Sequence, residues 1–128
     1  MTTAIIVEQS SLVALEIRQG LEAAGINVLE IVPDGATAVE RALFHRPHIM
    51  TVDLVLPRLS GLQVVAALRR HGLSTRVVVV SAVSAQTSIL AAREAGVSAY
   101  VLKPVSRTRL RELGVALAGP SRPAVAAR

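Results

Sequence analysis

The sequence contains no cysteine and no tryptophan, and only one phenylalanine and one tyrosine. Without cysteine, disulfide bonds and thiolate metal sites are excluded. With so few aromatic rings, there is no stacking platform for single-stranded nucleic acid. No apolar run approaches the roughly 20 residues that span a bilayer, and the N-terminus lacks the positive charge of a signal peptide. We therefore expect a cytoplasmic protein that does not enter the membrane.

The chain has 128 residues, and 52% of them are hydrophobic, which is enough to bury one core. Its net charge of +5 is unevenly distributed. Residues 1–99 are neutral overall, whereas residues 100–128 carry six basic groups against one acidic group. This basic end favours a solvated helix face and a tail over nucleic-acid binding. We predict one domain over residues 1–118, followed by a flexible tail or the start of a linker over residues 119–128.

Short runs rich in valine and isoleucine alternate with longer amphipathic segments along the chain. Gly25 ends the first helical segment, Asp34 is a candidate N-cap for the second, and Pro47 interrupts the second. Four consecutive valines at 77–80 predict a strand buried on both faces. The alternation predicts an α/β fold with a five-stranded parallel sheet and helices on both faces. The predicted strands are residues 4–7, 27–32, 49–52, 76–80 and 98–102.

Polar residues follow the carboxyl ends of four predicted strands. Glu8 and Gln9 follow the first strand, and Asp53 follows the third. Ser81 follows the fourth strand, and Lys103 follows the fifth. Ligands of open parallel sheets bind at this edge, so we expect these side chains to meet in one pocket. Carboxylates suit a hard cation such as Mg²⁺, while a hydroxyl and an ammonium group suit the oxygens of a phosphoryl group.

Two motifs carry a resemblance to a known family. Residues 53–61 have the pattern Asp-x-x-x-Pro-x-x-Ser-Gly, and residues 100–104 have the pattern Tyr-x-x-Lys-Pro. With Ile-Ile-Val-Glu at 5–8 and the valine run that ends in Ser81, the chain resembles the receiver domain of bacterial two-component signalling over about residues 4–118. The resemblance implies a flavodoxin-like (βα)5 fold with strand order 2-1-3-4-5.

The resemblance also implies a phosphoacceptor and a metal site. Asp53 would accept a phosphoryl group from a sensor histidine kinase, a phosphotransfer protein or a small phosphodonor. Glu8, Asp53 and the backbone carbonyl of Val55 would hold Mg²⁺. The chain departs from the family at Gln9, where receivers usually carry a second acidic residue. Because Mg²⁺ relies on carboxylates, we expect Gln9 to be a weak or lost ligand and metal binding to be weak.

Further roles implied by the resemblance concern the switch. Lys103 and Ser81 would contact the phosphoryl oxygens, and Tyr100 would change orientation with the phosphorylation state. The bond between Lys103 and Pro104 would be cis. The output face would comprise the fourth helix, fifth strand and fifth helix.

Three arginines lie on the last of these elements, at positions 107, 109 and 111. They favour an acidic output protein or a homodimer through this face.

Other functions are compatible with parts of the sequence. A degenerate receiver that binds proteins without phosphorylation is the main alternative, because of Gln9. A flavin carrier would need flanking aromatic residues, and a hydrolase would need Gly-x-Ser-x-Gly around Ser81. His45 and His48 have a loose metal-like spacing, but their position around Pro47 favours solvated or capping roles. The chain could also come from a DNA-binding regulator, although it contains no helix-turn-helix motif. We expect a signalling module and not an enzyme.

Overall fold

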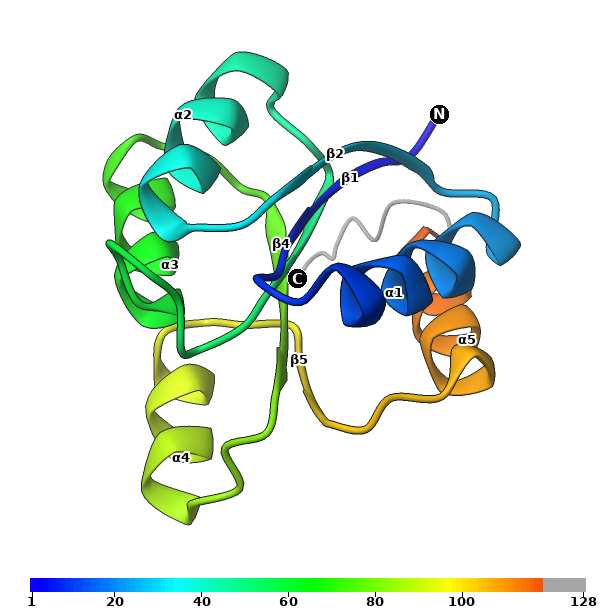
Figure 1. Ribbon diagram of the computed structural model, residues 1–128. Coiled ribbons are helices and arrows are strands. Elements are labelled where there is room, and N and C mark those ends of the chain that lie inside the picture. Colours follow the sequence, from blue (N-terminus) through cyan, green and yellow to red (C-terminus); the bar gives the residue numbers. More distant parts are fainter. Residues whose placement is uncertain (119–128) are drawn as a thin grey trace.

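The computed structural model describes residues 1–118, in which strands and helices alternate strictly along the chain (Figure 1). The tail predicted for residues 119–128 lies outside the described residues. The strands are β1 (Thr3–Val7), β2 (Asn27–Val32), β3 (Ile49–Val52), β4 (Arg76–Ser81) and β5 (Ala99–Leu102). The helices are α1 (Ser11–Ala23), α2 (Gly35–His45), α3 (Gly61–Arg70), α4 (Gln86–Glu94) and α5 (Arg107–Ala118).

The strands form one parallel sheet in the order β2-β1-β3-β4-β5, which confirms the predicted fold and strand order. The pairing register sets the position of the candidate site. Val7 of β1 pairs with Val52 of β3, and Ser81 of β4 pairs with Leu102 of β5. The next residues along β1, β3 and β5 therefore leave the sheet at the same edge.

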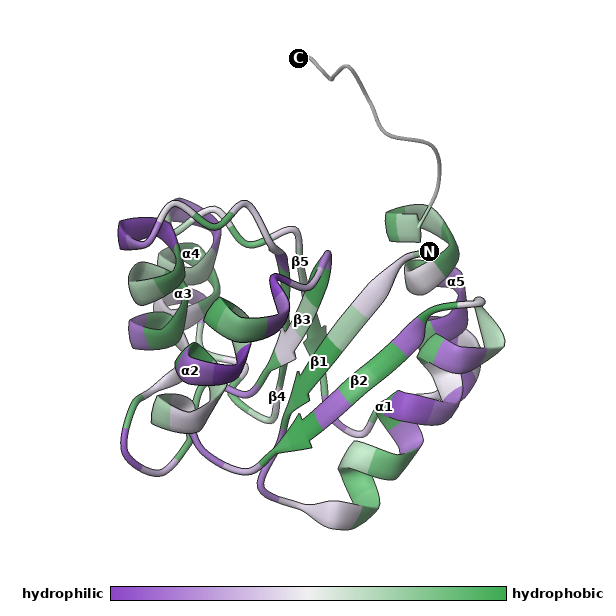
Figure 2. Ribbon diagram, turned by 90° about the horizontal axis from the view of Figure 1, so that it is seen from above, coloured by the Kyte–Doolittle hydropathy of each residue, from purple (hydrophilic) through white to green (hydrophobic). Residues whose placement is uncertain are grey.

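Helices cover both faces of the sheet. Figure 1 shows α2, α3 and α4 on one side and α1 and α5 on the other, and Figure 2 shows apolar strands between these layers. Each face has its own core, built from alternate residues of the strands. The valines at 77–80 are at most 1% exposed, so β4 is buried on both faces as predicted.

The helix ends follow local sequence signals. The Asp34 carboxylate accepts a hydrogen bond from the backbone N–H of Thr37 at 2.8 Å, which confirms Asp34 as the N-cap of α2. This helix ends with Arg46 in a left-handed conformation immediately before Pro47. Gly25 has a φ of +83° directly after the C-cap of α1, as the sequence predicts. The strand limits differ from the prediction by one residue at Thr3, Ser81 and Ser98, all at strand ends.

Candidate functional site

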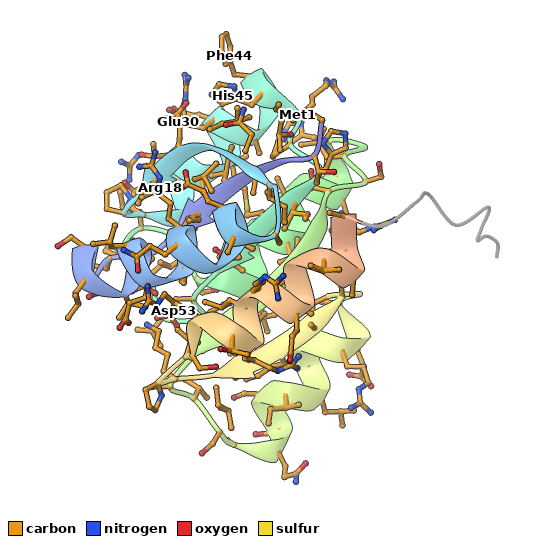
Figure 3. All side chains as sticks on the ribbon, turned by 90° about the vertical axis from the view of Figure 1, so that its right-hand side faces the viewer. Met1, Arg18, Glu30, Phe44, His45 and Asp53 are labelled. Atoms are coloured by element: carbon orange, nitrogen blue, oxygen red, sulfur yellow. The ribbon has the colours of Figure 1, made fainter. Side chains whose placement is uncertain are left out.

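A pocket of about 350 Å³ opens at the carboxyl edge of the sheet. Figure 3 shows Asp53 at this edge, away from Met1, which lies where β1 begins. The structure therefore brings together most of the residues that the sequence placed at the strand ends. The residues that line the pocket are Glu8, Gln9, Ser10, Asp53, Val55 and Lys103.

Lys103 lies between the two carboxylates of the pocket. Its Nζ donates a hydrogen bond to Asp53 Oδ2 at 2.7 Å and lies 2.9 Å from Glu8 Oε1. Burial alone lowers the pKa of Lys103, but its contacts with Asp53 and Glu8 outweigh this effect, so the pKa is raised. Lys103 is therefore a permanent positive charge beside Asp53 at neutral pH.

Glu8 is the most buried charged group of the pocket, with 4% of its surface exposed. Its Oε2 accepts a hydrogen bond from the backbone N–H of Ser10 at 3.0 Å. Its Oε1 lies 2.9 Å from Lys103 Nζ. A buried carboxylate is costly unless it meets a cation, and in this pocket Lys103 is that cation.

The loop after β3 holds Asp53 in place. Asp53 Oδ1 accepts a hydrogen bond from the backbone N–H of Val55 at 3.2 Å, while the loop closes through a bond from Gly61 N–H to the Leu54 carbonyl at 3.0 Å. A Cβ on Gly61 would lie 2.4 Å from the carbonyl oxygen of Asp53. The glycine of the Ser-Gly pair is thus required where α3 packs against the Asp53 backbone.

A second contact to this loop comes from the start of α2, and the sequence did not predict it. The backbone N–H of Gly35 donates to the Pro57 carbonyl at 3.2 Å, and a Cβ on Gly35 would lie 2.3 Å from the Leu59 carbonyl oxygen. Arg58 has a φ of +73° and lies 3.5 Å from Asp34. Nothing in the sequence indicated this pair, because arginine is not a residue that favours left-handed backbone.

Ser81 and Tyr100, which we expected at the phosphoryl site, are not among the residues that line the pocket. Ser81 is fully buried, its hydroxyl accepts a hydrogen bond from the backbone N–H of Val83 at 3.2 Å, and its carbonyl accepts one from Lys103 N–H. The Tyr100 hydroxyl donates to the Val83 carbonyl at 2.5 Å. Burial raises the pKa of Tyr100. Within residues 1–118 no hydrogen bond joins Asp53 to Ser81 or Tyr100, although both reach the segment after β4.

The donor atoms of the pocket fit a hard cation. Glu8 and Asp53 supply carboxylates and Val55 lines the same pocket, so oxygen ligands predominate, as Mg²⁺ requires. The observation that carries this fit is the buried Glu8 carboxylate, which already meets one cation, the Lys103 ammonium group, at 2.9 Å. In the part of the chain that the structure describes, no three His, Asp or Glu side chains gather. The exposed Gln9 side chain supplies a neutral amide where receivers usually have a second carboxylate.

The two histidines with metal-like spacing have separate partners. His45 Nε2 lies 2.6 Å from Glu30 Oε2, and Figure 3 shows this pair beside Phe44, far from Asp53. His48 Nδ1 accepts a hydrogen bond from the backbone N–H of Thr3 at 3.0 Å. His48 is exposed, in agreement with the predicted solvated role, whereas His45 is half-buried against Glu30; the two histidines have different partners and do not form a common site.

The strand order and the pocket of two carboxylates and a lysine at the carboxyl edge define a receiver-type signalling domain. A model of the response regulator receiver domain matches residues 4–113, and the chain therefore belongs to that family. The protein is accordingly a receiver domain of a response regulator in two-component signalling. The Lys103–Pro104 bond is cis. Within residues 1–118 no helix is long and apolar enough to cross a membrane.

Individual relatives differ in how much of their length the chain covers. It is 36% identical over 127 residues to protein-glutamate methylesterase/protein-glutamine glutaminase 5 of Myxococcus xanthus, covering 96% of this chain but 36% of that protein. It is 26% identical to the chemotaxis protein CheY of Bacillus subtilis, covering 84% of this chain and 90% of CheY. The signal receiver domain of NarL from Mycobacterium tuberculosis superposes with a TM-score of 0.85 at 27% identity, covering 93% of this chain and 98% of that domain.

Proposed function

We propose that Asp53 is the phosphoacceptor of this receiver domain, and that it takes a phosphoryl group from a phosphohistidine of a sensor kinase or phosphotransfer protein. The observation that supports this role is the contact between Asp53 Oδ2 and Lys103 Nζ at 2.7 Å, inside a pocket open to solvent. Both oxygens of Asp53 are oriented, one by Lys103 and the other by the N–H of Val55. Such an aspartate is accessible and fixed in direction, as a nucleophile requires.

The transfer step needs little from the protein except position and charge. An Asp53 oxygen attacks phosphorus while the bond between phosphorus and the donor's histidine nitrogen breaks, so the histidine leaves with the electron pair of that bond. The Lys103 ammonium lies within reach of the oxygens of the incoming group and stabilises their charge. Its raised pKa keeps it protonated throughout.

Glu8, Asp53 and the Val55 carbonyl would hold Mg²⁺, with Gln9 as a weak or absent ligand. When bound, the ion would offset the negative charge of the phosphoryl oxygens. Glu8 has a buried oxygen for this purpose, whereas the neutral amide of Gln9 attracts a cation less than a carboxylate would. We therefore expect weaker metal binding and slower phosphorylation than in a receiver with two acids after β1.

Ser81 and Tyr100 are the proposed switch residues. Both side chains are hydrogen-bonded to the backbone of Val83. The Ser81 hydroxyl accepts from the Val83 N–H, and the Tyr100 hydroxyl donates to the Val83 carbonyl. If Ser81 turned towards a phosphoryl group on Asp53, it would release Val83 and alter the hydrogen bond of Tyr100. The change would then reach the face formed by α4, β5 and α5, where an output protein or a second copy would bind.

Helix α5 is also basic. Its arginines at positions 107, 109 and 111 are exposed and fit an acidic partner, although Arg107 is directed at α1, where it donates a hydrogen bond to Gln19. The whole arrangement would operate in the cytoplasm.

A labelling experiment tests the proposal. The purified protein is incubated with acetyl phosphate and Mg²⁺, and the gain of one phosphoryl group is followed by intact-mass spectrometry. Asp53→Asn should abolish labelling. Asp34→Asn is a matched control, because it changes the chain's other aspartate and asparagine is an equally good N-cap. Gln9→Asp should bind Mg²⁺ more tightly and label faster.

The alternative function, a phosphorylation-independent protein-binding module, predicts a different result. Wild type would then gain no mass under conditions that label a typical receiver, and Asp53→Asn would behave as wild type does. If labelling persists in Asp53→Asn and disappears in Asp34→Asn, the phosphoacceptor is Asp34 and the proposal for Asp53 is wrong.

A further inference from the structure

A larger cavity lies at the opposite edge of the sheet from Asp53. It has a volume of about 730 Å³, roughly twice that of the Asp53 pocket, and falls within the usual range for small-molecule sites. Its walls come from residues beside the amino ends of three strands, including Thr2 before β1, His48 before β3 and Thr75 before β4. Leu117, in the last turn of α5, closes one side.

The lining of this cavity is positively charged. It includes Arg46, Arg76 and His48, and among the described residues it includes no carboxylate. The ion pairs shorter than 4 Å in residues 1–118 involve neither Arg46 nor Arg76. At the Asp53 edge, by contrast, Lys103 meets two carboxylates. Within residues 1–118, the charges of Arg46 and Arg76 beside the larger cavity are therefore not neutralised by an ion pair.

Two arginines hold the segments that line the cavity. Arg69 Nη1 donates to the carbonyls of Leu73 and Thr75, each at 2.9 Å, which fixes the turn between α3 and β4. Arg76 Nη1 donates to the Leu117 carbonyl at 2.7 Å, which joins the end of α5 to the start of β4. These bonds satisfy backbone carbonyls, and within residues 1–118 the other guanidinium N–H groups of Arg76 have no hydrogen-bond partner and could bind a ligand.

Backbone geometry also defines the positions of Arg46 and His48. Arg46 is exposed and occupies a left-handed position with a φ of +46° at the C-cap of α2. A non-glycine residue in this region is uncommon and points to a local requirement. His48 Nδ1 accepts the Thr3 N–H at 3.0 Å, so a proton of this ring lies on Nε2, where it can be donated to a ligand.

We propose that this cavity binds a small oxyanion with at least two negative charges, either a phosphorylated or a polycarboxylate compound. Guanidinium groups bind phosphate and carboxylate oxygens through paired N–H donors, and Arg46 and Arg76 supply them from two elements. Ser74 and Thr75 line the same cavity. No aromatic side chain lines it among the described residues, so a nucleobase would gain no stacking there. This site is separate from the proposed phosphorylation of Asp53.

A nuclear magnetic resonance titration of the full chain tests this site. Backbone amide shifts are followed while pyrophosphate or citrate is added at constant ionic strength. We compare wild type with Arg46→Gln and with Arg18→Gln, a control that removes the same charge from the exposed Arg18–Glu22 pair on α1. Wild type should show saturable changes at Gly72, Ser74 and Thr75. Arg46→Gln should weaken binding about tenfold, as expected for a lost charge-assisted hydrogen bond; Arg18→Gln should leave it unchanged.

The relative affinity of pyrophosphate and citrate distinguishes a phosphoryl from a carboxylate ligand. The proposal fails if neither anion causes saturable changes at up to about 10 mM, a concentration above which binding would be too weak to be specific. It also fails if the two variants weaken binding equally, because the effect would then come from net charge. Changes confined to the amides of Val55 and Lys103 would assign binding to the Asp53 pocket and overturn the proposal as well.

Discussion

Replacing Lys103 with methionine should destabilise the protein in a way that depends on pH. The substitution keeps an unbranched side chain of similar length but removes the ammonium group that contacts Asp53 at 2.7 Å and Glu8 at 2.9 Å. The two carboxylates would then face one pocket without a counter-charge. Glu8 has little access to water, since its side chain is 3% exposed, so its charge would be poorly screened.

The magnitude follows from these contacts. At an effective dielectric constant of 20, each contact at this distance corresponds to about 6 kcal/mol of gross attraction, much of which dehydration of the charges offsets. Removing one partner of a buried ion pair costs about 3–5 kcal/mol. Lys103 remains 19% exposed and the pocket is open, so we expect about 3 kcal/mol at pH 7, at the low end of that range.

Urea unfolding of wild type and Lys103→Met at pH 7 and at a pH above 10.5 measures this effect. The raised pKa of Lys103 means that its contribution to stability is fully present at pH 7 and is lost as the pH rises through that pKa, so the difference in stability should shrink at the higher pH. The double variant Glu8→Gln/Lys103→Met is the control and should recover part of the loss, because it removes one unbalanced charge. An equal loss at both pH values, with no recovery in the double variant, would refute the charge argument.

Three further predictions concern other residues. Gly35→Ala should lower the unfolding free energy by about 2 kcal/mol, since its Cβ would lie 2.3 Å from the Leu59 carbonyl oxygen, and an unchanged urea midpoint would contradict this. Thr51→Val should raise it by about 1 kcal/mol, because the buried Thr51 hydroxyl has no hydrogen-bond partner among the described residues; a lower midpoint would reveal a partner. Tyr100 is the chain's one tyrosine, so absorbance at alkaline pH reports it alone. Burial raises the pKa of Tyr100, so the midpoint of this absorbance titration should lie above pH 10.0. The free energy of unfolding should fall as the pH rises through that midpoint. A midpoint at or below pH 10.0 would contradict the burial of Tyr100.

Most of the fold could be predicted from the sequence because its signals are local and repeated. The valine and isoleucine runs locate the strands, and residues such as Gly25 and Asp34 mark helix ends through backbone requirements that few other residues meet. The predicted limits of β4 and β5 each differ from the structure by one residue, because a strand end depends on pairing with its neighbour. Ser81 joins β4 through its pairing with Leu102, which no local pattern indicates.

The candidate site was predictable to the extent that topology alone determines it. Parallel strands with aligned ends bring Glu8, Asp53 and Lys103 to one edge whatever their side-chain conformations. The support of the Asp53 loop was not predictable, because Gly35 and Arg58 act through backbone contacts between segments distant in the sequence. The basic cavity was missed for the same reason, since its arginines are scattered along the chain.

The charge of the Asp53 pocket links these findings to the switch. Glu8 and Asp53 carry two negative charges and Lys103 carries one positive charge, which leaves a single net negative charge beside the neutral Gln9. A second acid at position 9 would double that charge, strengthen cation binding and add repulsion around Asp53. With Gln9, the single Lys103 ammonium neutralises half of the carboxylate charge of the pocket. With a third carboxylate at position 9 it would neutralise only one third. Loss of Lys103 should therefore impair both the stability of this receiver and its capacity to hold a phosphoryl group.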